Sequence, residues 1–483
     1  MNLQEINFPS TCSEYLQRFV TNSRESKAVD RLAAALRASL YTDYHRIKGI
    51  SYGDWMTSSY ESYYFSSASL PQLHMYGIWE SGCTDTILLA CSAIHSWVKL
   101  CEKTGDKFRG KNRIWNSGGS ETTILPDKKG ISVLLNDGAS IFFNTPPDYT
   151  SLTEAMKISG NFSGMWTWKS RDERRLAEEF LRQSSPKNAY NLRRMHEAGL
   201  VVCIDERSPQ TTEETWRCLC SPHSSRWFPN AIQYFIFRSG ITVVCLDHLS
   251  FIGGDFDPLI QGWKEGMKDF AYFKYSCDSC PEVLEWDTIN INEGLSEILT
   301  NIKKTHIRHF YVELPEKISA ARLTHFFTKA LRQIHGDPVP IFSIGCSMEH
   351  LGEKLDFAFL VPAEVSRLIN NSVDFEKMVR RELSIVKNGG GIYARLYAIS
   401  CLDENVSEIC MDPFLTSFLI VADYMTVVRT GTSFSINTLK PDGEKGICTS
   451  FNTDNNNGLH CTVTGFSEYE VETTHRELHD IIC

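Results

Sequence analysis

Near the start of the chain, apolar residues recur at intervals of three and four positions. Between residues 26 and 40 these apolar residues are Val29, Leu32, Ala35, Leu36 and Leu40. Residues 85–100 show the same spacing. Such intervals place side chains on one face of an α-helix. The pattern therefore predicts that the chain begins with helices.

Two short apolar segments, residues 131–135 and 140–143, flank an Asn-Asp-Gly sequence at 136–138. Asn or Asp followed by Gly favours the tight turns that join antiparallel strands. These segments are therefore predicted to form a β-hairpin. A Ser-Arg-Asp-Glu sequence at 170–173 then starts a predicted helix, which ends near Ser-Pro at 185–186.

Three further apolar runs, at residues 200–204, 232–237 and 241–246, are rich in Val, Ile, Tyr and Phe. These residue types favour strands, and runs of this length fit a buried sheet. The last two runs are separated by Arg-Ser-Gly at 238–240, which predicts a second hairpin.

The second half of the chain repeats this mixture. Helical spacing returns between about residues 290 and 336 and at 373–386, and strand-like runs follow near 432–439, 446–451 and 459–466. Helices and strands are mixed without a regular alternation, so the predicted fold class is α/β, of the α+β kind, with two units side by side.

At 483 residues the chain is too long for a single hydrophobic core. We expect N-terminal helices at 1–95 that pack with the second domain, a first domain at 96–290 and a second domain at 291–483. Hydrophobic residues make up 42% and charged residues 22%, so the whole chain is predicted to fold.

Charge and hydropathy exclude two classes of partner. Lys and Arg total 49 against 59 for Asp and Glu, and no basic stripe stands out, so nucleic acid is not expected to bind. The apolar runs are far shorter than the ~20 residues that span a bilayer. We expect a monomer that acts on a small molecule.

The cysteines and the chain ends indicate a cytoplasmic protein. Residues 1–5 lack the basic and apolar parts of a signal peptide, so most of the 16 cysteines are expected to be free, buried thiols. The last four residues, Asp-Ile-Ile-Cys, form neither a peroxisomal signal nor a prenylation box.

His248 is the main candidate for chemistry. It follows the apolar run at 241–246 directly and precedes a predicted glycine loop at 253–254. A hairpin can deliver such a side chain into a cleft. Taken alone, a histidine beside an apolar strand is more often a hydrogen-bonded core residue.

The surroundings of His248 favour the functional interpretation, because they resemble the carnitine/choline acyltransferases. That family carries an Asn-Arg-Trp-(Phe/Tyr) segment, two strands, and a catalytic histidine followed five residues later by glycine. Similar segments continue along roughly residues 110–483. The residues that carry the resemblance are Arg171, Asp172, Cys203, Asp205, Arg226, Trp227, Phe228, His248, Gly253, His350, Gly352, Met411, Asp412, Pro441, Asp442, Gly443, Gly446, Cys448, Glu472 and Thr473.

The resemblance implies two chloramphenicol-acetyltransferase-like domains with an active-site tunnel between them. It also implies that His248 is a general base, which takes the proton of an acceptor hydroxyl while that oxygen attacks a thioester carbonyl. A neutral imidazole suits this task, because the unperturbed pKa of histidine is about 6.5.

One departure concerns the group that orients the base. The family has a carboxylate four residues after its histidine, where this chain has Ile252. Asp247, Asp255 or Asp257 could substitute. The alternative is that these are solvated loop carboxylates.

Other departures concern the substrates. Where the family contacts carnitine, this chain has Phe342 and Ile344, and Thr426 is the one aliphatic hydroxyl at the oxyanion motif. Trp227, Phe342, Ile344 and Thr426 are the predicted substrate-binding residues. The lysines that hold coenzyme A phosphates should precede Lys317, but residues 309–314 contain none.

These substitutions predict acyl transfer to a hydroxyl or amine other than that of carnitine. The expected setting of this reaction is specialised metabolism. The donor would be acyl-CoA or an acyl carrier protein thioester, with no tightly bound cofactor. An alternative is a repurposed enzyme that catalyses a cyclisation or carbon–carbon bond formation without CoA. A third is a non-catalytic binding protein, against which the retention of His248 and Gly253 argues.

Cys218, Cys220 and His223, together with Cys277 and Cys280, have zinc-ligand types and one CxxC spacing. They fall in a segment predicted to be a variable loop, and cysteine is common throughout the chain. We therefore expect no metal site. The glycine-rich segments at 117–120 and 388–391 lack the lysine of a phosphate-binding loop and are predicted to be turns.

Overall fold

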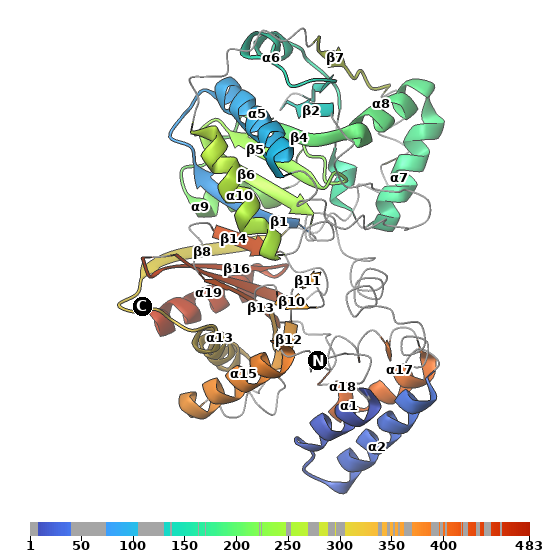
Figure 1. The fold of residues 1–483 in the computed structure, drawn as a ribbon, viewed down its shortest axis with the longest axis vertical. Helices are drawn as coiled ribbons and strands as arrows, with labels where there is room; N and C mark the ends of the chain where they lie inside the picture. The colour runs from blue at the N-terminus through green and yellow to red at the C-terminus, as the bar shows by residue number, and fades with distance from the viewer. Residues whose placement is uncertain are drawn as a thin grey trace. The chain divides into compact units, whose positions relative to one another are not determined.

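Two β-sheets organise the chain in a computed structural model, one in each of two units (Figure 1). Unit 1 is built from Met1–Phe65, Arg308–Ser433 and Asp442–Cys483, and unit 2 from Ser66–Ile307 with Phe434–Pro441. The structure describes residues 8–39, 74–104, 130–135, 138–162, 164–169, 171–221, 223, 225–247, 253–268, 280–287, 295, 305–336, 341–344, 348–350, 353–355, 358–361, 370–387, 396, 399–400, 403–416, 418, 424–430, 435–438, 446–454 and 456–483.

The sheet of unit 2 has eight strands among the described residues, in the order β14-β1-β6-β5-β4-β2-β3-β7. The pairs β2–β4 and β4–β5 are parallel, and the other neighbours are antiparallel. The strands are β1 His74–Glu80, β2 Gly130–Leu134, β3 Ser140–Phe143, β4 Ala198–Asp205, β5 Ile232–Phe237, β6 Ile241–Asp247, β7 Glu282–Val283 and β14 Ser435–Thr438.

Helices cover both faces of this sheet. The helices of unit 2 are α5 Thr86–Thr104, α6 Tyr149–Ala155, α7 Arg171–Ser184, α8 Pro186–Glu197, α9 Thr212–Cys220 and α10 Gly253–Met267, with the 3₁₀ turn η4 Met165–Trp168. α5 and α10 share a core with alternate residues of the strands, and the Trp263 indole N–H donates to the Ala93 carbonyl at 2.9 Å. On the opposite face, Trp216 of α9 packs edge-on against Tyr76 of β1.

Two glycines close the predicted hairpins. Gly138 follows β2 with φ +86°, and Gly240 joins β5 to β6 with φ +84°. Only glycine adopts this region without strain. A Cβ at position 240 would also lie 2.3 Å from the Cys83 carbonyl oxygen. Both hairpins are confirmed, although residues 136–137 of the first turn lie outside the described part.

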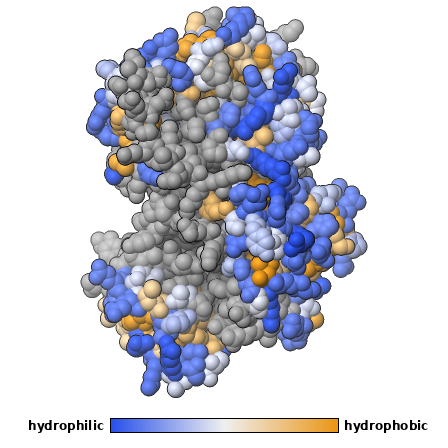
Figure 2. All heavy atoms as spheres, turned by 180° about the vertical axis from the view of Figure 1, so that it is seen from behind, coloured by the Kyte–Doolittle hydropathy of each residue, from blue (hydrophilic) through white to orange (hydrophobic). Residues whose placement is uncertain are grey.

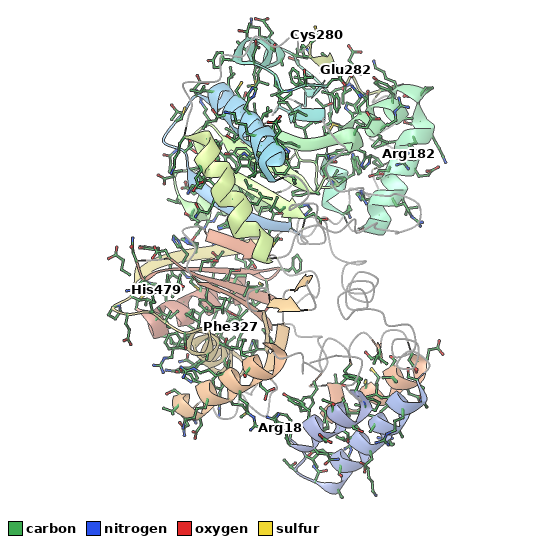
Figure 3. All side chains as sticks on the ribbon, in the orientation of Figure 1. Arg18, Arg182, Cys280, Glu282, Phe327 and His479 are labelled. Atoms are coloured by element: carbon green, nitrogen blue, oxygen red, sulfur yellow. The ribbon has the colours of Figure 1, made fainter. Side chains whose placement is uncertain are left out.

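The sheet of unit 1 has six described strands in the order β12-β9-β13-β15-β16-β8. Its strands are β8 His306–Glu313, β9 Ile341–Ile344, β12 Ala358–Val361, β13 Tyr424–Thr430, β15 Ile447–Thr453 and β16 Gly458–Gly465, and a separate ribbon pairs β10 Met348–His350 with β11 Glu353–Leu355. α13 Ala320–His335, α15 Ser372–Lys387 and α19 Glu468–Ile482 belong to the same unit. Phe327 of α13 is fully buried in their common core (Figure 3).

The N-terminal helices α1 Phe8–Gln17 and α2 Ser23–Ala38 join the core of unit 1, together with α17 Glu404–Cys410 and α18 Pro413–Thr416. A polar contact ties α1 to α15. The Tyr15 hydroxyl donates to Glu382 at 2.8 Å, and Arg18, labelled in Figure 3, forms an ion pair with the same carboxylate at 3.0 Å. Glu382 is buried, so both donors help to compensate its charge.

The predicted fold class, two mixed α/β units each with its own sheet, is confirmed. The division of the chain at residues 96 and 291 and the tunnel between the domains stay predictions. Several described strands were not predicted, β1 and β8 among them. Both β1, with a glycine at its centre, and β8, with His and Arg at alternate positions, lack the long apolar runs that mark the other strands.

The described residues on the face shown in Figure 2 are mainly hydrophilic. On the face in Figure 2, the described hydrophobic residues are scattered among hydrophilic ones. Across the described residues, no helix combines the length and apolar character that a membrane span requires.

Candidate active site

The β5–β6 hairpin carries the chain to the candidate base. β6 ends at Asp247, whose backbone N–H donates to the carbonyl of Ala231 at 2.9 Å, so the strand is paired up to its last residue. Asp247 is half-buried. His248 and Ile252 lie outside the described residues, and the role of His248 stays a prediction.

The glycines after His248 differ from the prediction. Gly253 and Gly254 open helix α10 instead of forming a loop, and Asp255 lies in the first turn of this helix. The side chain of Asp255 is outside the described part of the chain. Its role as a support for the base stays a prediction, as does that of Asp257.

The segment 225–230 runs into β5 and is held inside unit 2. Trp227 is fully buried, and its indole N–H donates to Asn230 at 2.8 Å. The Asn230 amide in turn donates to the Ala198 carbonyl at 2.6 Å, at the start of β4. The Trp227 ring contacts Trp166 and His196 edge-on. Trp227 therefore anchors this segment, and a contact with substrate stays a prediction.

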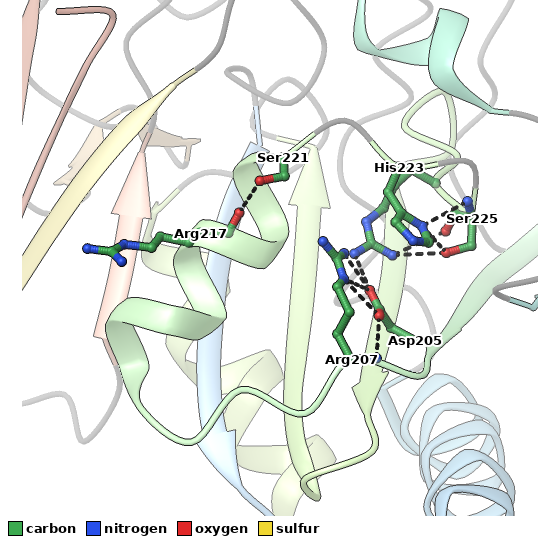
Figure 4. A network of polar contacts seen from close by, with 7 residues as sticks. Asp205, Arg207, Arg217, Ser221, His223 and Ser225 are labelled. Atoms are coloured by element: carbon green, nitrogen blue, oxygen red, sulfur yellow. Dashed lines mark hydrogen bonds and ion pairs between the residues drawn. The ribbon is translucent and has the colours of Figure 1, made fainter. Parts of the chain in front are cut away.

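A buried ion pair holds the start of the same segment (Figure 4). Arg226 and Asp205 are both fully buried, and Arg226 Nη2 lies 2.6 Å from Asp205 Oδ2. Arg207 adds a second guanidinium, with Nη2 at 2.6 Å and Nε at 2.9 Å from the carboxylate oxygens. The Arg226 guanidinium also lies 4.8 Å from the centre of the Phe235 ring.

The charges around Asp205 determine its ionisation. Burial alone would raise the pKa of its carboxyl group. The hydrogen bond from Arg207 and the charges of Arg226 and Arg207 outweigh burial and hold this pKa well below its usual range. Asp205 is therefore ionised at all physiological pH values, which keeps Arg226 paired.

His223 and Ser225 border this ion pair (Figure 4). The Ser225 backbone N–H donates to His223 Nδ1 at 3.2 Å, and the Ser225 hydroxyl lies 2.8 Å from the same nitrogen. Burial and the charges of Arg226 and Arg207 lower the pKa of His223 to about 4, so the ring is neutral. Within the described ranges, no group of three or more His, Cys, Asp or Glu residues could hold a metal.

The remaining predicted substrate residues belong to unit 1. Thr426 on β13 is fully buried, and it occupies the same face as Tyr424, whose ring lies 5.0 Å from His335 of α13. The Thr426 side chain thus lies on the helix-covered face. In the parallel pairing of β9 with β13, Phe342 is the register partner of Met425 and Ile344 that of Val427, whereas Thr426 is paired with Ser343. Their roles in binding stay predictions.

The opposite face of this sheet carries buried polar residues that the sequence analysis did not identify. Gly465 faces Val471 of α19, so its alternating neighbours Thr462 and Thr464 point away from the helices. Thr462 pairs with Ser450 and Thr464 with Cys448. The three hydroxyl side chains are at most 1% exposed. Their signal in the sequence is Thr and Ser at alternate positions of two strands.

The resemblance predicts lysines that bind the phosphates of coenzyme A in the region of β8, but β8 contains no lysine. Arg308 forms an ion pair with Glu472 of α19. His309 Nε2 lies 3.3 Å from His460 Nδ1 on β16. Burial and the neighbouring His460 lower the pKa of His309 to about 3, so this ring is neutral near pH 7.

Residues 151–310 match the family model described as Choline/Carnitine o-acyltransferase. This stretch contains the Arg226–Phe228 segment, the β5–β6 hairpin and His248. The predicted resemblance is therefore confirmed over these residues. No curated protein matches the chain.

Several solved structures are similar to this chain at low identity. The epimerization domain from the third module of tyrocidine synthetase B covers 59% of this chain and 78% of its own, with 9% identity and a TM-score of 0.33. The starter condensation domain of rhizomide synthetase RzmA covers 88% and 92%, with 9% identity and a TM-score of 0.34. The EpoB cyclization-docking bidomain from Sorangium cellulosum covers 59% and 70%, with 10% identity and a TM-score of 0.33.

Proposed function

We propose that this chain, whose residues 151–310 match the Choline/Carnitine o-acyltransferase model, transfers an acyl group from a thioester to a hydroxyl or amine other than that of carnitine. The observation that carries the proposal is the hairpin within the matched stretch. β6 is paired to its last residue, Asp247, and His248 is the next residue of the chain.

In the proposed reaction His248 acts as general base. Its neutral imidazole takes the proton of the acceptor O–H or N–H while the oxygen or nitrogen forms a bond to the thioester carbonyl carbon. The carbon–sulfur bond then breaks, and the imidazolium gives its proton to the departing sulfur, so that a free thiol leaves and the neutral imidazole is restored. No covalent intermediate on the protein and no external oxidant or reductant is needed. Asp247 or Asp255 would support the charged imidazole.

The proposed acceptor is less charged than carnitine. Phe342 and Ile344 stand where the resembling family has its carnitine contacts, and neither side chain type can pair with a carboxylate. Trp227, buried within the segment that leads into β5, would shape the site from inside the protein. Thr426 is the proposed hydroxyl donor from β13.

The proposed donor is acyl-CoA or an acyl group on a carrier protein. The neutral His309 and the paired Arg308 on β8 favour the carrier protein, because little charge is left there for the phosphates of free CoA. A carrier-bound donor would agree with a role in specialised metabolism and with a cytoplasmic location.

The experiment is a thiol-release assay with a panel of acyl-CoA and acyl-pantetheine thioesters, each combined with carnitine, choline, polyols and amines. The variant is His248→Ala, and His479→Ala is the control, since His479 is half-exposed on α19. Release that requires both an acceptor and His248 is expected. Release that persists in His248→Ala would refute the assigned base.

No release with any donor and acceptor would refute acyl transfer from these thioesters. That outcome would favour the alternative of a repurposed enzyme that catalyses a cyclisation or carbon–carbon bond formation without CoA. Conversion of acyl carnitine would contradict the proposed acceptor class.

A further inference from the structure

Two imidazoles face each other on neighbouring strands of unit 1. His309 lies on β8 and His460 on β16, and these strands are adjacent at one edge of the six-stranded sheet (Figure 1). His309 Nε2 lies 3.3 Å from His460 Nδ1, and the stacked rings have centroids 5.5 Å apart. The ring of Tyr311 contacts that of His460, with centroids 4.8 Å apart. Three ring side chains from two strands therefore form one cluster.

The cluster lies on the face of the sheet that α19 does not cover. Phe310 packs edge-on against His475 of α19, so its neighbours on β8, His309 and Tyr311, point to the opposite face. Both imidazoles of the pair are half-buried, and Tyr311 beside them is 48% exposed. The pair is therefore close to solvent.

The separation of the two facing nitrogens suits one tetrahedral metal ion. Zinc binds imidazole nitrogen at about 2.0–2.1 Å with tetrahedral angles, which places two such nitrogens ~3.3–3.4 Å apart. Adjacent ligands on an octahedral ion with bonds of that length would lie ~2.9 Å apart. The observed separation of 3.3 Å is at the long end for a direct hydrogen bond between the rings and agrees with the tetrahedral value.

Both rings have the protonation state that a metal ligand requires. Burial, followed by the neighbouring His460 and His475, lowers the pKa of His309 to about 3, and burial lowers the pKa of His460. Each neutral ring carries one proton, which His309 can hold on Nδ1 and His460 on Nε2. The facing nitrogens then both present lone pairs, and neither ring has to release its proton when a metal binds.

Carboxylates beside the cluster favour a cation. Burial and the charges of Asp454 and Glu313 raise the pKa of Tyr311, and Asp454 opposes the effect of burial on the pKa of His460. Asp454 Oδ1 accepts the backbone N–H of Gly458 at 2.7 Å, which holds this carboxylate in the turn before β16. Negative charge held at this end of the strands lowers the energy of a divalent cation between the imidazoles.

We propose that His309 and His460 form a binding site for a divalent transition-metal ion of the zinc class, held in tetrahedral coordination. Groups of three or more His, Cys, Asp or Glu that could hold a metal are absent from the described ranges, so water would complete the coordination. The bound ion would join the edge strand β8 to β16 through side chains. This site does not depend on the proposed acyl transfer.

The first test uses Co²⁺, which replaces Zn²⁺ in tetrahedral sites and absorbs visible light strongly when it is four-coordinate. Titration of the chain with CoCl₂ is expected to produce this absorption, and added Zn²⁺ should remove it by competition. His309→Gln and His460→Gln should each weaken Co²⁺ binding by about tenfold or more, because loss of even an outer-shell partner costs ~10–100-fold. His479→Gln changes a half-exposed histidine of α19 and is the matched control, with unchanged binding expected.

Thiolates are the competing ligands, since the chain has 16 cysteines. Co²⁺ bound to thiolate adds a charge-transfer band in the near ultraviolet, so the same titration separates the two kinds of site. The proposal is overturned if no four-coordinate band appears. It is equally overturned if the band persists with unchanged affinity in both His309→Gln and His460→Gln.

The second test measures hydrogen exchange of β16 amides with and without Zn²⁺. An ion that binds only the folded unit slows exchange through unfolding by about 100-fold when its concentration is 100 times the Kd found by competition. This slowing is expected in the wild-type chain and not in His309→Gln. The exchange of the variant without Zn²⁺ also shows whether it is folded; if it is not, His460→Gln takes its place. Equal exchange of wild-type β16 with and without Zn²⁺ would contradict the site.

Discussion

Breaking the Asp205–Arg226 ion pair should destabilise unit 2 strongly, and the loss of stability should depend on which of the two residues is replaced. Both side chains are 0% exposed, so neither charge can reach water when its partner is removed. Removing one partner of a buried pair costs about 3–5 kcal/mol of unfolding free energy. We expect a loss of this size for Asp205→Asn, which keeps the shape of the side chain but leaves Arg226 without a countercharge.

Arg226→Met should cost less, about 1–3 kcal/mol. Asp205 would then keep its contacts with Arg207, whose Nη2 and Nε lie at 2.6 and 2.9 Å. Arg207 can make this adjustment because its side chain is 29% exposed. Methionine also fills most of the space of the arginine stem. The double variant Asp205→Asn with Arg226→Met should be no less stable than Asp205→Asn alone.

Urea unfolding followed by tryptophan fluorescence measures these costs selectively. Of the ten tryptophans, all but Trp55 lie at residues 66–307 in unit 2, so the signal reports this unit. This matters because a chain with two units need not unfold in a single step. Arg217→Met is the matched control. It removes an exposed pair with Glu213 on α9 and should cost at most about 0.5 kcal/mol.

Two results would contradict the reasoning. One is a cost for Asp205→Asn within the range of the Arg217→Met control. The other is a cost for Arg226→Met that equals or exceeds that of Asp205→Asn, since Arg207 would then not compensate Asp205. Either result would mean that the segment 225–230 is held by its aromatic contacts and not by the ion pair.

Three further predictions follow from contacts outside this ion pair. Burial lowers the pKa of His309 to about 3, so the unfolded chain binds this proton first as the pH falls below about 6.5. Unit 1 should therefore lose up to ~1.4 kcal/mol of stability for each pH unit below that value. His309→Gln should flatten this pH profile, measured by hydrogen exchange of β16 amides. Glu382→Gln keeps an oxygen that can accept from Tyr15 but removes the charge paired with Arg18, so it should weaken the attachment of α1 and raise hydrogen exchange in residues 8–17. No increase would show that the ion pair with Arg18 contributes nothing. Gly240→Ala should cost about 1–3 kcal/mol in the fluorescence transition, because of its φ of +84° and the nearby Cys83 carbonyl, and an unchanged transition would show that the turn can rearrange.

The strands nearest the candidate base were predictable because their signals are local. β5 and β6 are long runs of apolar residues joined by a glycine with positive φ, and the structure forms both as expected. β1 was not predictable in this way. Its sequence, His-Met-Tyr-Gly-Ile-Trp-Glu, becomes a strand through pairing with β6 on one side and β14 on the other.

The network around Arg226 shows the same limit. The Arg-Trp-Phe sequence marks the segment, but nothing local predicts that Asp205, 21 residues earlier, lies 2.6 Å from Arg226. Likewise the strand predicted near 432–439 corresponds to β14, Ser435–Thr438, whereas no strand was predicted over β13, Tyr424–Thr430. Its register then decides that Thr426 shares a face with Tyr424 and the helices.

By itself, the sequence determined the α/β class, most of the long helices, the two glycine-closed hairpins and the resemblance confirmed over residues 151–310. These features depend on periodicity, turn residues and short motifs, which a chain carries locally. Only the tertiary structure decided that His309 lies beside His460 and that Arg226 and Arg207 share Asp205. Such pairings join residues that are distant in sequence, and they arise when burial in a common sheet leaves each polar group only the partners that the packing provides.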